Sequence, residues 1–202
     1  MELVIASSNV HKIRECRSIL KQLRFLDLLS LLDFPNYQPP EETGKTFEEN
    51  ARLKALHAAQ ALDKWVIADD SGLVVPALKG EPGVRSARFA GEGATDKDNR
   101  KKLLEMMRPL TESERTAYFE CWIVLASPQG VVRAVSGLCE GSIITEEKGN
   151  HGFGYDPLFL KYEYSKTFAE IDEETKNRIS HRRKALDKIL PTLESISFAT
   201  AT

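Results

Sequence analysis

Short apolar runs alternate along this chain with stretches of helical period. Leu3-Val4-Ile5-Ala6 is wholly apolar, a pattern typical of a strand buried on both faces, and Ser7-Ser8-Asn9 ends it. Phe25 to Leu32 is predicted as a second strand. Between the two we predict a helix whose apolar face is formed by Ile13, Cys16, Ile19 or Leu20, and Leu23.

A long loop and a second helix are predicted in the following segment. Residues 33–45 are rich in Pro and acidic residues and are too many for a simple connection. Thr46 and Glu49 have the spacing of a capping box, and an Ala-rich helix is predicted from there to about Leu62.

The second half of the chain continues this mixture of strands and helices. The Gly/Pro-rich segment 80–93 is predicted as loop, and a helix begins near Thr95 with apolar positions at Leu103, Leu104 and Met107. Thr116 to Ser127 and Val131 to Leu138 are predicted as strands of a hairpin.

A final helix is predicted at the C-terminal end of the chain. It begins near Ser180 or His181 and ends by Pro191 or shortly after. The tail from about residue 195 to residue 202 has no periodicity and is predicted to fray.

Composition limits the class of protein. With 202 residues, 42% hydrophobic and 29% charged, the chain fits one globular domain over residues 1–202, with room for two lobes around a cleft. A net charge of −2 gives no general attraction to nucleic acid or to an anionic membrane. No apolar run reaches the length of a membrane span, and no signal peptide is recognised. The three cysteines have no metal-ligand spacing, so we expect free thiols in a cytoplasmic protein.

Two adjacent carboxylates, Asp69 and Asp70, follow the apolar run Trp65 to Ala68, and Ser71-Gly72 comes next. A strand that ends in this way places acids at the carboxyl edge of a sheet, where open α/β folds bind ligands. Paired carboxylates there suit Mg²⁺ and, with it, a phosphate ester. The alternative is a strand followed by a solvated turn.

Ser7-Ser8-Asn9-Val10-His11-Lys12 forms a strand-to-helix turn. Small residues and the free N–H groups of the following helix favour phosphate binding there. Lys12 opposes the helix dipole, which an anion beside it would relieve. The alternative is an ordinary capped helix with a surface lysine. The Gly-x-x-x-x-Gly-Lys pattern of a Walker loop is absent.

The segment from Glu42 to Lys54 holds a second group of polar residues. Glu42 lies in the long loop and is predicted to reach a metal that Asp70 also holds. Asn50 and Lys54 are four residues apart on one helical face, so both can point into one site. Taken alone, Lys54 has the pattern of a surface lysine.

Two further segments carry candidate ligand contacts. In Asn150-His151-Gly152-Phe153-Gly154-Tyr155-Asp156-Pro157, glycines flank an aromatic ring that could stack on a nucleobase, unless these aromatics fill the core. Residues 176–184 include Lys176, His181 and Arg182 and are predicted as a basic cluster at a helix N-terminus. An anionic ligand would relieve that arrangement, and a solvated basic face is the alternative.

Taken in order, these segments resemble the inosine/xanthosine triphosphate pyrophosphatases. The similarity spans residues 3 to about 190, and each motif is weak alone. The matching motifs are Ser8-Asn9-x-x-Lys12, Glu42-x-Gly44-x-Thr46-Phe47-x-Glu49-Asn50-x-x-x-Lys54, Ala68-Asp69-Asp70-Ser71-Gly72-Leu73, Pro82-Gly83-Val84-x-Ser86-Ala87-Arg88, Gly152-Phe153-Gly154-Tyr155-Asp156-Pro157 and Ser180-His181-Arg182. Two departures are Ser7-Ser8-Asn9 in place of Thr-Gly-Asn, and Asn150-His151 in place of smaller residues.

The resemblance implies an α/β fold with a long, mixed, twisted central sheet flanked by helices, and two lobes with a central active-site cleft. It also implies a Mg²⁺-dependent homodimer that hydrolyses ITP, dITP and XTP to the monophosphate and pyrophosphate. The runner-up enzymes are the Maf-like pyrophosphatases, which act on other modified nucleotides. A nucleotide-binding sensor without turnover is the alternative from a different class.

The resemblance also implies roles for individual residues. Glu42 and Asp70 would hold Mg²⁺, and Asp70, supported by Asp69, would orient or deprotonate the attacking water. The substrate phosphates and ribose would be bound by Ser7, Ser8, Asn9, Val10, His11, Lys12, Lys54 and Ser71. The base and nearby phosphate groups would be surrounded by Phe153, Gly154, Tyr155, Asp156, Lys176, His181 and Arg182.

Overall fold

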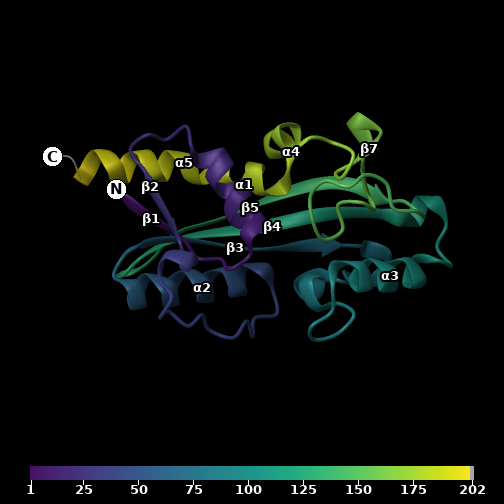
Figure 1. The fold of residues 1–202 in the computed structure, drawn as a ribbon, viewed down its shortest axis with the longest axis horizontal. Coiled ribbons are helices and arrows are strands. Elements are labelled where there is room, and N and C mark those ends of the chain that lie inside the picture. The colour runs from purple at the N-terminus through teal and green to yellow at the C-terminus, as the bar shows by residue number, and fades with distance from the viewer. Residues whose placement is uncertain (201–202) are drawn as a thin grey trace. The chain divides into compact units, whose positions relative to one another are not determined.

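The protein folds as a mixed, seven-stranded open sheet with helices packed against it (Figure 1). The computed structural model describes residues 1–200, with side chains as far as Phe198. The strand order is β2-β1-β3-β4-β5-β6-β7. The strands are β1 (Glu2–Ile5), β2 (Asp27–Ser30), β3 (Trp65–Val74), β4 (Thr116–Ser127), β5 (Gly130–Ile143), β6 (Phe159–Lys161) and β7 (Lys166–Thr167).

Five α-helices lie within the described residues. They are α1 (Val10–Leu20), α2 (Phe47–Leu62), α3 (Asp96–Met107), α4 (Glu173–Ile179) and α5 (His181–Thr200). β1 pairs in parallel with β2 and with β3, whereas β6 pairs antiparallel with β5 and with β7. The predicted α/β class with a mixed sheet is therefore confirmed, while the predicted cleft between two lobes stays a prediction.

The chain divides into two compact units, and each is built from separated segments. Unit 1 comprises residues 1–70, 121–137 and 181–202, and unit 2 comprises residues 71–120 and 138–180. Strands β3, β4 and β5 each contribute residues to both units. The organisation as a single domain stays a prediction.

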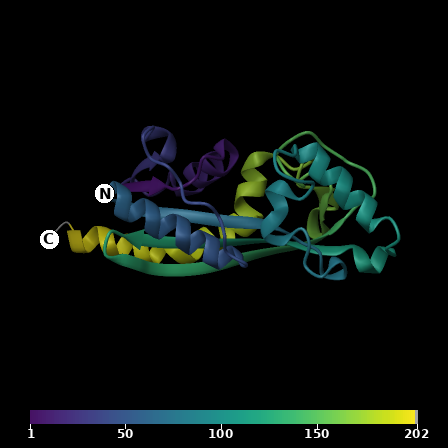
Figure 2. The ribbon, with the colours of Figure 1, turned by 90° about the horizontal axis from the view of Figure 1, so that it is seen from below.

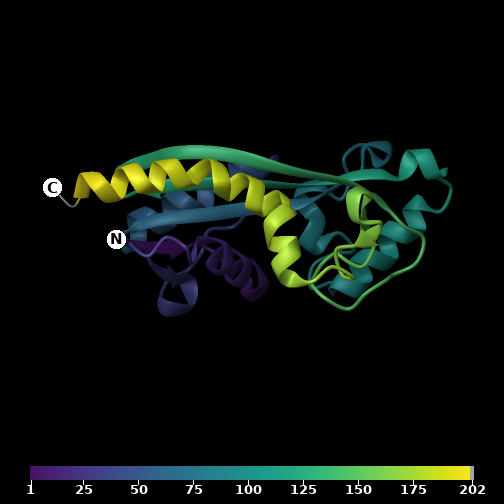
Figure 3. The same ribbon diagram turned by 90° about the horizontal axis from the view of Figure 1, so that it is seen from above.

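In unit 1, helices cover both faces of the sheet. Ile67 of β3 packs with the apolar residues of α1 and α5, whereas Val66 and Ala68 pack with the alanines of α2. This division follows from the strand period of two, because successive side chains point to opposite faces. Seen from below, α2 lies in front of the strands (Figure 2), and seen from above, α5 does (Figure 3).

In unit 2, an apolar cluster joins α3 to the sheet. Leu103 and Met107 of α3 pack with Leu73, with the aromatic group Phe119, Phe159 and Phe168, and with Tyr155. Phe119 and Phe159 are tilted at 4.7 Å between ring centroids, a favourable aromatic geometry.

Strand β3 is longer than predicted. It continues through Asp69 and Asp70 to Val74, so the prediction that it ends at the acid pair is wrong. Leu73 and Val75 are fully buried in the core of unit 2, and their packing extends the strand. The acids nevertheless lie beyond the last β1–β3 pair, Ile5 with Ile67. They are at the carboxyl edge of the parallel strands because β1 stops there.

The C-terminal helices also differ from the prediction. The pattern did not indicate α4, and α5 continues past Pro191 to Thr200. Proline removes one helical N–H bond, but apolar side chains beyond it, Leu193 and Ile196, pack on the core of unit 1 and hold the helix. Residues 195–200 continue the helix, their predicted fraying stays a prediction, and residues 201 and 202 lie outside the described residues. No helix within residues 1–200 is both long and apolar enough to span a bilayer.

A close approach of backbone segments requires a glycine at position 137. A Cβ at Gly137 in β5 would lie 2.2 Å from the carbonyl oxygen of His181 and 2.5 Å from the amide nitrogen of Ala185. Because α5 then rests directly on the strand, any side chain must displace the helix backbone.

We predict that Gly137→Ala lowers the free energy of unfolding by about 1–3 kcal/mol, the usual cost of overpacking. Urea denaturation followed by circular dichroism measures the change. Leu138→Ala is the matched control, since its side chain is exposed in the same strand. An unchanged stability of the glycine variant would contradict this packing.

Candidate active site

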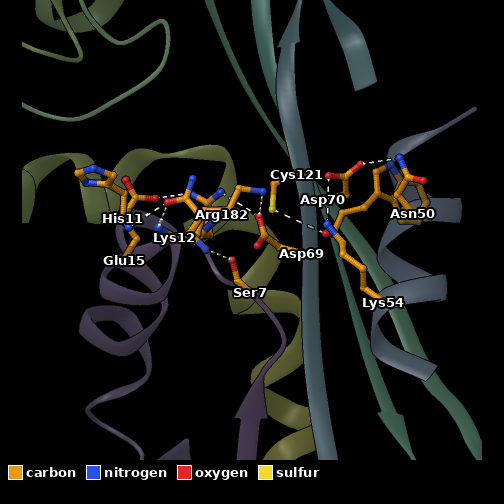
Figure 4. A network of polar contacts seen from close by, with 12 residues as sticks. Ser7, His11, Lys12, Glu15, Asn50, Lys54, Asp69, Asp70, Cys121 and Arg182 are labelled. Atoms are coloured by element: carbon orange, nitrogen blue, oxygen red, sulfur yellow. Dashed lines mark hydrogen bonds and ion pairs between the residues drawn. The ribbon is translucent and has the colours of Figure 1, made fainter. Parts of the chain in front are cut away.

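Asp69 and Asp70 occupy successive positions of β3 and therefore face opposite sides of the sheet (Figure 4). Asp69 points to the side of α1 and α5, where it meets Lys12 and Arg182. Asp70 points to the side of α2, where it meets Asn50 and Lys54. The strand thus separates two adjacent carboxylates into two environments.

On the first side, Asp69 is the centre of a buried ion-pair network. Its Oδ2 lies 3.1 Å from Lys12 Nζ and 2.9 Å from a terminal guanidinium nitrogen of Arg182. Arg182 also pairs with Glu15 of α1. Arg182, Glu15 and Asp69 are all buried, so these charges neutralise one another away from water.

Local structure at the start of α1 brings Lys12 to this network. Asn9 is the N-cap, and its Oδ1 accepts the N–H groups of His11 at 3.0 Å and Lys12 at 3.2 Å. Ser7 Oγ in turn accepts the N–H of Asn9 at 3.1 Å. The capped helix start of the alternative interpretation is present, but Lys12 is not an ordinary surface lysine, because its ammonium pairs with Asp69.

The other members of the turn, Ser8, Val10 and His11, are exposed. Their predicted contacts with the substrate stay predictions.

On the second side, Lys54 joins two carboxylates from different segments. Its Nζ lies 3.1 Å from Oε1 of Glu42 and 3.3 Å from Oδ1 of Asp70. Asn50 donates from Nδ2 to the other oxygen of Asp70 at 3.1 Å, and its own Oδ1 accepts the N–H of Gly44 at 2.8 Å. The predicted grouping of these residues around Asp70 is present in the structure.

The two aspartates differ in their affinity for protons. Burial alone would raise the pKa of Asp69, but Lys12, Arg182 and Lys54 hold it well below its usual range. Burial raises the pKa of Asp70 above its usual value, and the charges of Lys54 and Lys12 only partly oppose this. Asp69 is thus a permanent anion, whereas Asp70 is the better proton acceptor.

Lys54 remains a cation despite its burial. Burial acts to lower its pKa, but the charges of Asp70, Asp69 and Glu42 raise it above its usual value. A charged ammonium at this position can contact a phosphate as well as the carboxylates.

The donor set on the side of α2 fits a hard divalent cation. Glu42 and Asp70 already share one cationic partner, the ammonium of Lys54. Mg²⁺ is usually bound through one or two carboxylates, with water and substrate phosphates completing its shell. Within residues 1–200 no group of three or more acidic, His or Cys side chains is placed to hold a metal. A Mg²⁺ site here would therefore depend on substrate oxygens.

The predicted base-contact segment lies in unit 2 and forms a tight turn. Gly152 has a φ of +75°, and a Cβ there would lie 2.0 Å from Oδ2 of Asp156, so only glycine fits. That oxygen accepts the N–H of Phe153 at 3.0 Å and pairs with Lys176 Nζ at 2.6 Å. The ammonium of Lys176 lies 4.9 Å from the centroid of the Phe153 ring.

Tyr155 differs from Phe153 in its surroundings. It is buried in the apolar cluster of unit 2, and its hydroxyl donates to the carbonyl of Ser86 at 2.9 Å. Burial and, to a smaller extent, the charge of Asp96 raise the pKa of Tyr155 above its usual value. Its side chain is therefore part of the core, whereas Phe153 is only partly buried.

The basic cluster differs from its prediction as a single helix N-terminus. Lys176 and Arg178 lie in the last turn of α4, where the dipole favours cations, and only the residues from His181 onward begin α5. Lys176 and Arg182 are buried and paired with acids, and Arg183 pairs with Asp187. Carboxylates of the chain itself thus neutralise much of this cluster.

Sequence reasoning missed Glu15, Asp96 and Arg100. Glu15 lies three residues after Lys12 on α1, a spacing that could have placed both on one face. Asp96 and Arg100 have the ordinary pattern of a solvated helix, and both contact Gly154.

The fold and this arrangement define an α/β protein with two carboxylates and two lysines at the carboxyl edge of parallel strands, suited to bind a metal and a polyphosphate. The model of the Ham1 family matches residues 3–192, and the chain belongs to this family.

Named relatives agree with this assignment. A Protochlamydia amoebophila protein named dITP/XTP pyrophosphatase is 56% identical over 197 residues, covering 97% of this chain and 99% of that protein. A Chlamydia abortus protein of the same name is 58% identical over 197 residues, covering 97% and 96%. The resemblance stated from the motifs is thereby confirmed.

Solved structures of the family have the same fold. The Ham1 protein of Staphylococcus aureus has a TM-score of 0.85 at 43% identity, covering 96% of this chain and 99% of that one. A HAM1 protein of Coxiella burnetii has a TM-score of 0.87 at 39% identity, with the same coverage.

We predict that Arg182→Leu destabilises the protein by about 3–5 kcal/mol, because Glu15 and Asp69 would lose their shared buried partner. Arg183→Leu is the matched control, since its pair with Asp187 is more exposed and worth under ~1 kcal/mol. Urea denaturation measures both. Equal losses of unfolding free energy in the two variants would show that the buried network stabilises the protein no more than an exposed ion pair does.

Proposed function

We propose that this protein hydrolyses non-canonical purine nucleoside triphosphates, namely ITP, dITP and XTP, to the monophosphate and pyrophosphate. Family membership supports the reaction. The structural observation that carries it is the placement of Asp69 and Asp70 on opposite faces of β3, each carboxylate paired with its own lysine, Lys12 or Lys54. The activity would remove deaminated purines from the nucleotide pool.

Asp70 has the properties required of the residue that activates water. It is deeply buried at the edge of the parallel strands, and its carboxylate can accept a proton from water. Asn50 holds one of its oxygens and Lys54 the other, so the carboxylate has a fixed orientation. Water that loses its proton to Asp70 would attack the α-phosphorus and expel pyrophosphate.

Lys12 and Lys54 are the cations of the site. Both ammonium groups are held at carboxylates of β3, from opposite faces of the strand. They would neutralise the charge that develops on the triphosphate in the transition state. The exposed turn at the start of α1, which includes Ser8 and Val10, would add phosphate contacts.

Glu42 and Asp70 are the residues that would hold Mg²⁺. A bound Mg²⁺ supplies positive charge to the phosphate oxygens and to the departing pyrophosphate. The same proposal includes assembly and location: a cytoplasmic homodimer whose partner is a small nucleotide, with no nucleic-acid or membrane partner.

Base recognition is proposed for Phe153 and its neighbours in unit 2, and the contact of His181 with the base stays a prediction. Hypoxanthine and xanthine carry an acceptor at position 6, whereas adenine carries a donor, so N–H groups aimed at position 6 would select the deaminated bases. Guanine also has a carbonyl there, and its exclusion requires a contact near the 2-amino group. Arg182 is buried between Asp69 and Glu15, which favours a role in positioning Asp69 over the predicted contact with the base.

Two alternatives to this activity were a Maf-like pyrophosphatase and a sensor. Membership of the Ham1 family argues against the Maf-like enzyme. A sensor without turnover would need no residue to activate water. The fixed orientation of the Asp70 carboxylate therefore argues against a sensor. Release of pyrophosphate from ITP in the presence of Mg²⁺ is the test. A substrate panel of ITP, XTP, dITP, dUTP, TTP and GTP then gives the selectivity.

We expect Asp70→Asn to lower kcat by about 10²–10⁴-fold while the protein remains folded, because the amide cannot take a proton from water. Steady-state release of pyrophosphate from ITP measures the loss, and thermal denaturation checks the fold. Asp27→Asn, an exposed acid at the start of β2, is the control. Near-normal turnover in the Asp70 variant would remove this residue from the mechanism.

Replacing Lys12 or Lys54 with Ala should cost about 2–5 kcal/mol of transition-state stabilisation, seen as a lower kcat/KM for ITP. Lys21→Ala, at the exposed C-terminal end of α1, is the control and should retain full activity. If kcat/KM is unchanged and only the melting temperature falls, both lysines serve the fold alone.

A further inference from the structure

Two side chains of α3 hold both polar groups of a single residue, Gly154. Asp96 Oδ2 accepts the N–H of Gly154 at 2.7 Å, and Arg100 donates to its carbonyl oxygen at 2.9 Å. Asp96 and Arg100 are four residues apart, so they lie one above the other on the same face of the helix. Arg100 is itself held by Glu147, at 2.9 Å from its Nε.

These contacts are needed because Gly154 has little else to orient it. Its φ is +60°, in the left-handed region where glycine moves freely, and no heavy atom lies within 4 Å of the position of a Cβ. Packing therefore does not fix the orientation of this residue. The two charge-assisted hydrogen bonds, from Gly154 to Asp96 and from Arg100 to Gly154, fix it instead.

Fixing Gly154 also fixes the peptide groups on either side of it. A peptide bond is planar and trans, so its N–H points opposite to its C=O. The hold of Arg100 on the Gly154 carbonyl thus sets the direction of the N–H of Tyr155. That N–H forms no backbone hydrogen bond within the described residues 1–200, although nearly all buried backbone donors have a partner.

The position of the Phe153 ring also depends on these contacts, through the peptide group that joins Phe153 to Gly154. The N–H of Gly154 belongs to the peptide group that carries the Phe153 carbonyl, and this carbonyl accepts the N–H of Asp156 at 3.2 Å. Asp96 thus anchors one end of the Phe153 backbone, and Asp156, which accepts the Phe153 N–H, anchors the other.

We propose that Asp96 and Arg100 are positioning residues that set base selectivity, because they aim the Tyr155 N–H at the 6-carbonyl of a base stacked on Phe153. The inference rests on the proposed function. An N–H aimed at position 6 donates a hydrogen bond to the carbonyl of hypoxanthine or guanine and opposes the amino group of adenine. Asp96 and Arg100 therefore govern the discrimination between ITP and ATP, and leave that between ITP and GTP to other groups.

The test compares kcat/KM for ITP, GTP and ATP in the full-length protein carrying Asp96→Ala or Arg100→Met. We expect the ratio of ITP to ATP to fall at least about tenfold, and the ratio of ITP to GTP to stay within about threefold. Asp96→Asn keeps an acceptor oxygen for the Gly154 N–H and should restore most of the lost selectivity. Amide hydrogen exchange should show faster exchange at Gly154 in Asp96→Ala.

Two neighbours on α3 are the matched controls. Asp98→Ala removes an acid of the same helical turn that caps α3 through Thr95 and does not contact Gly154. Lys101→Met removes the cation next to Arg100 from an exposed position. Both should leave the ratios unchanged, even if the first lowers the melting temperature.

The outcomes separate the two proposals. A wild-type protein that releases no pyrophosphate from any purine triphosphate overturns the proposed function and this inference with it. An active, selective wild type overturns the inference alone if Asp96→Ala and Arg100→Met lose all three substrates by one common factor or keep the ITP to ATP ratio. The same conclusion follows if Asp96→Asn behaves like Asp96→Ala.

Discussion

The site depends on one geometric constraint, the opposite orientation of successive side chains in a strand. Asp69 and Asp70 are neighbours in sequence, yet β3 places them in separate environments with separate cations. Two carboxylates on one face would repel each other and share protons. Separation by the strand allows one to stay ionised within an ion-pair network and the other to remain a base.

The buried network around Asp69 links the candidate active site to the fold of unit 1. Arg182 begins α5, Glu15 and Lys12 belong to α1, and Asp69 belongs to β3. Burying these charges is costly unless all of them are paired, so the elements can pack only when the pairs form. The same contacts that hold the two helices on the sheet therefore place Lys12.

The segment of unit 2 that we propose to contact the base is held by polar contacts to its backbone and to Asp156. Its glycines give the turn its shape, and charged side chains of α3 and α4 hold its peptide groups and Asp156. A loop that depended on packing alone would need bulky side chains at the positions where a flat ligand approaches. Polar contacts from α3 and α4 hold this segment without such side chains.

Much of the fold was predictable because its signals are local. The helical faces of α1 and α3 and the capping box of Thr46 with Glu49 depend on residues within one or two turns, and the structure confirms them, except that α1 ends at Leu20, before the predicted Leu23. The motifs were likewise sufficient to recognise the family. Tertiary structure alone decided the length of β3, the continuation of α5 past Pro191 and the burial of Arg182. Arg182 is separated from Glu15 by 167 residues and from Asp69 by 113, and no local pattern carries information on partners at such distances.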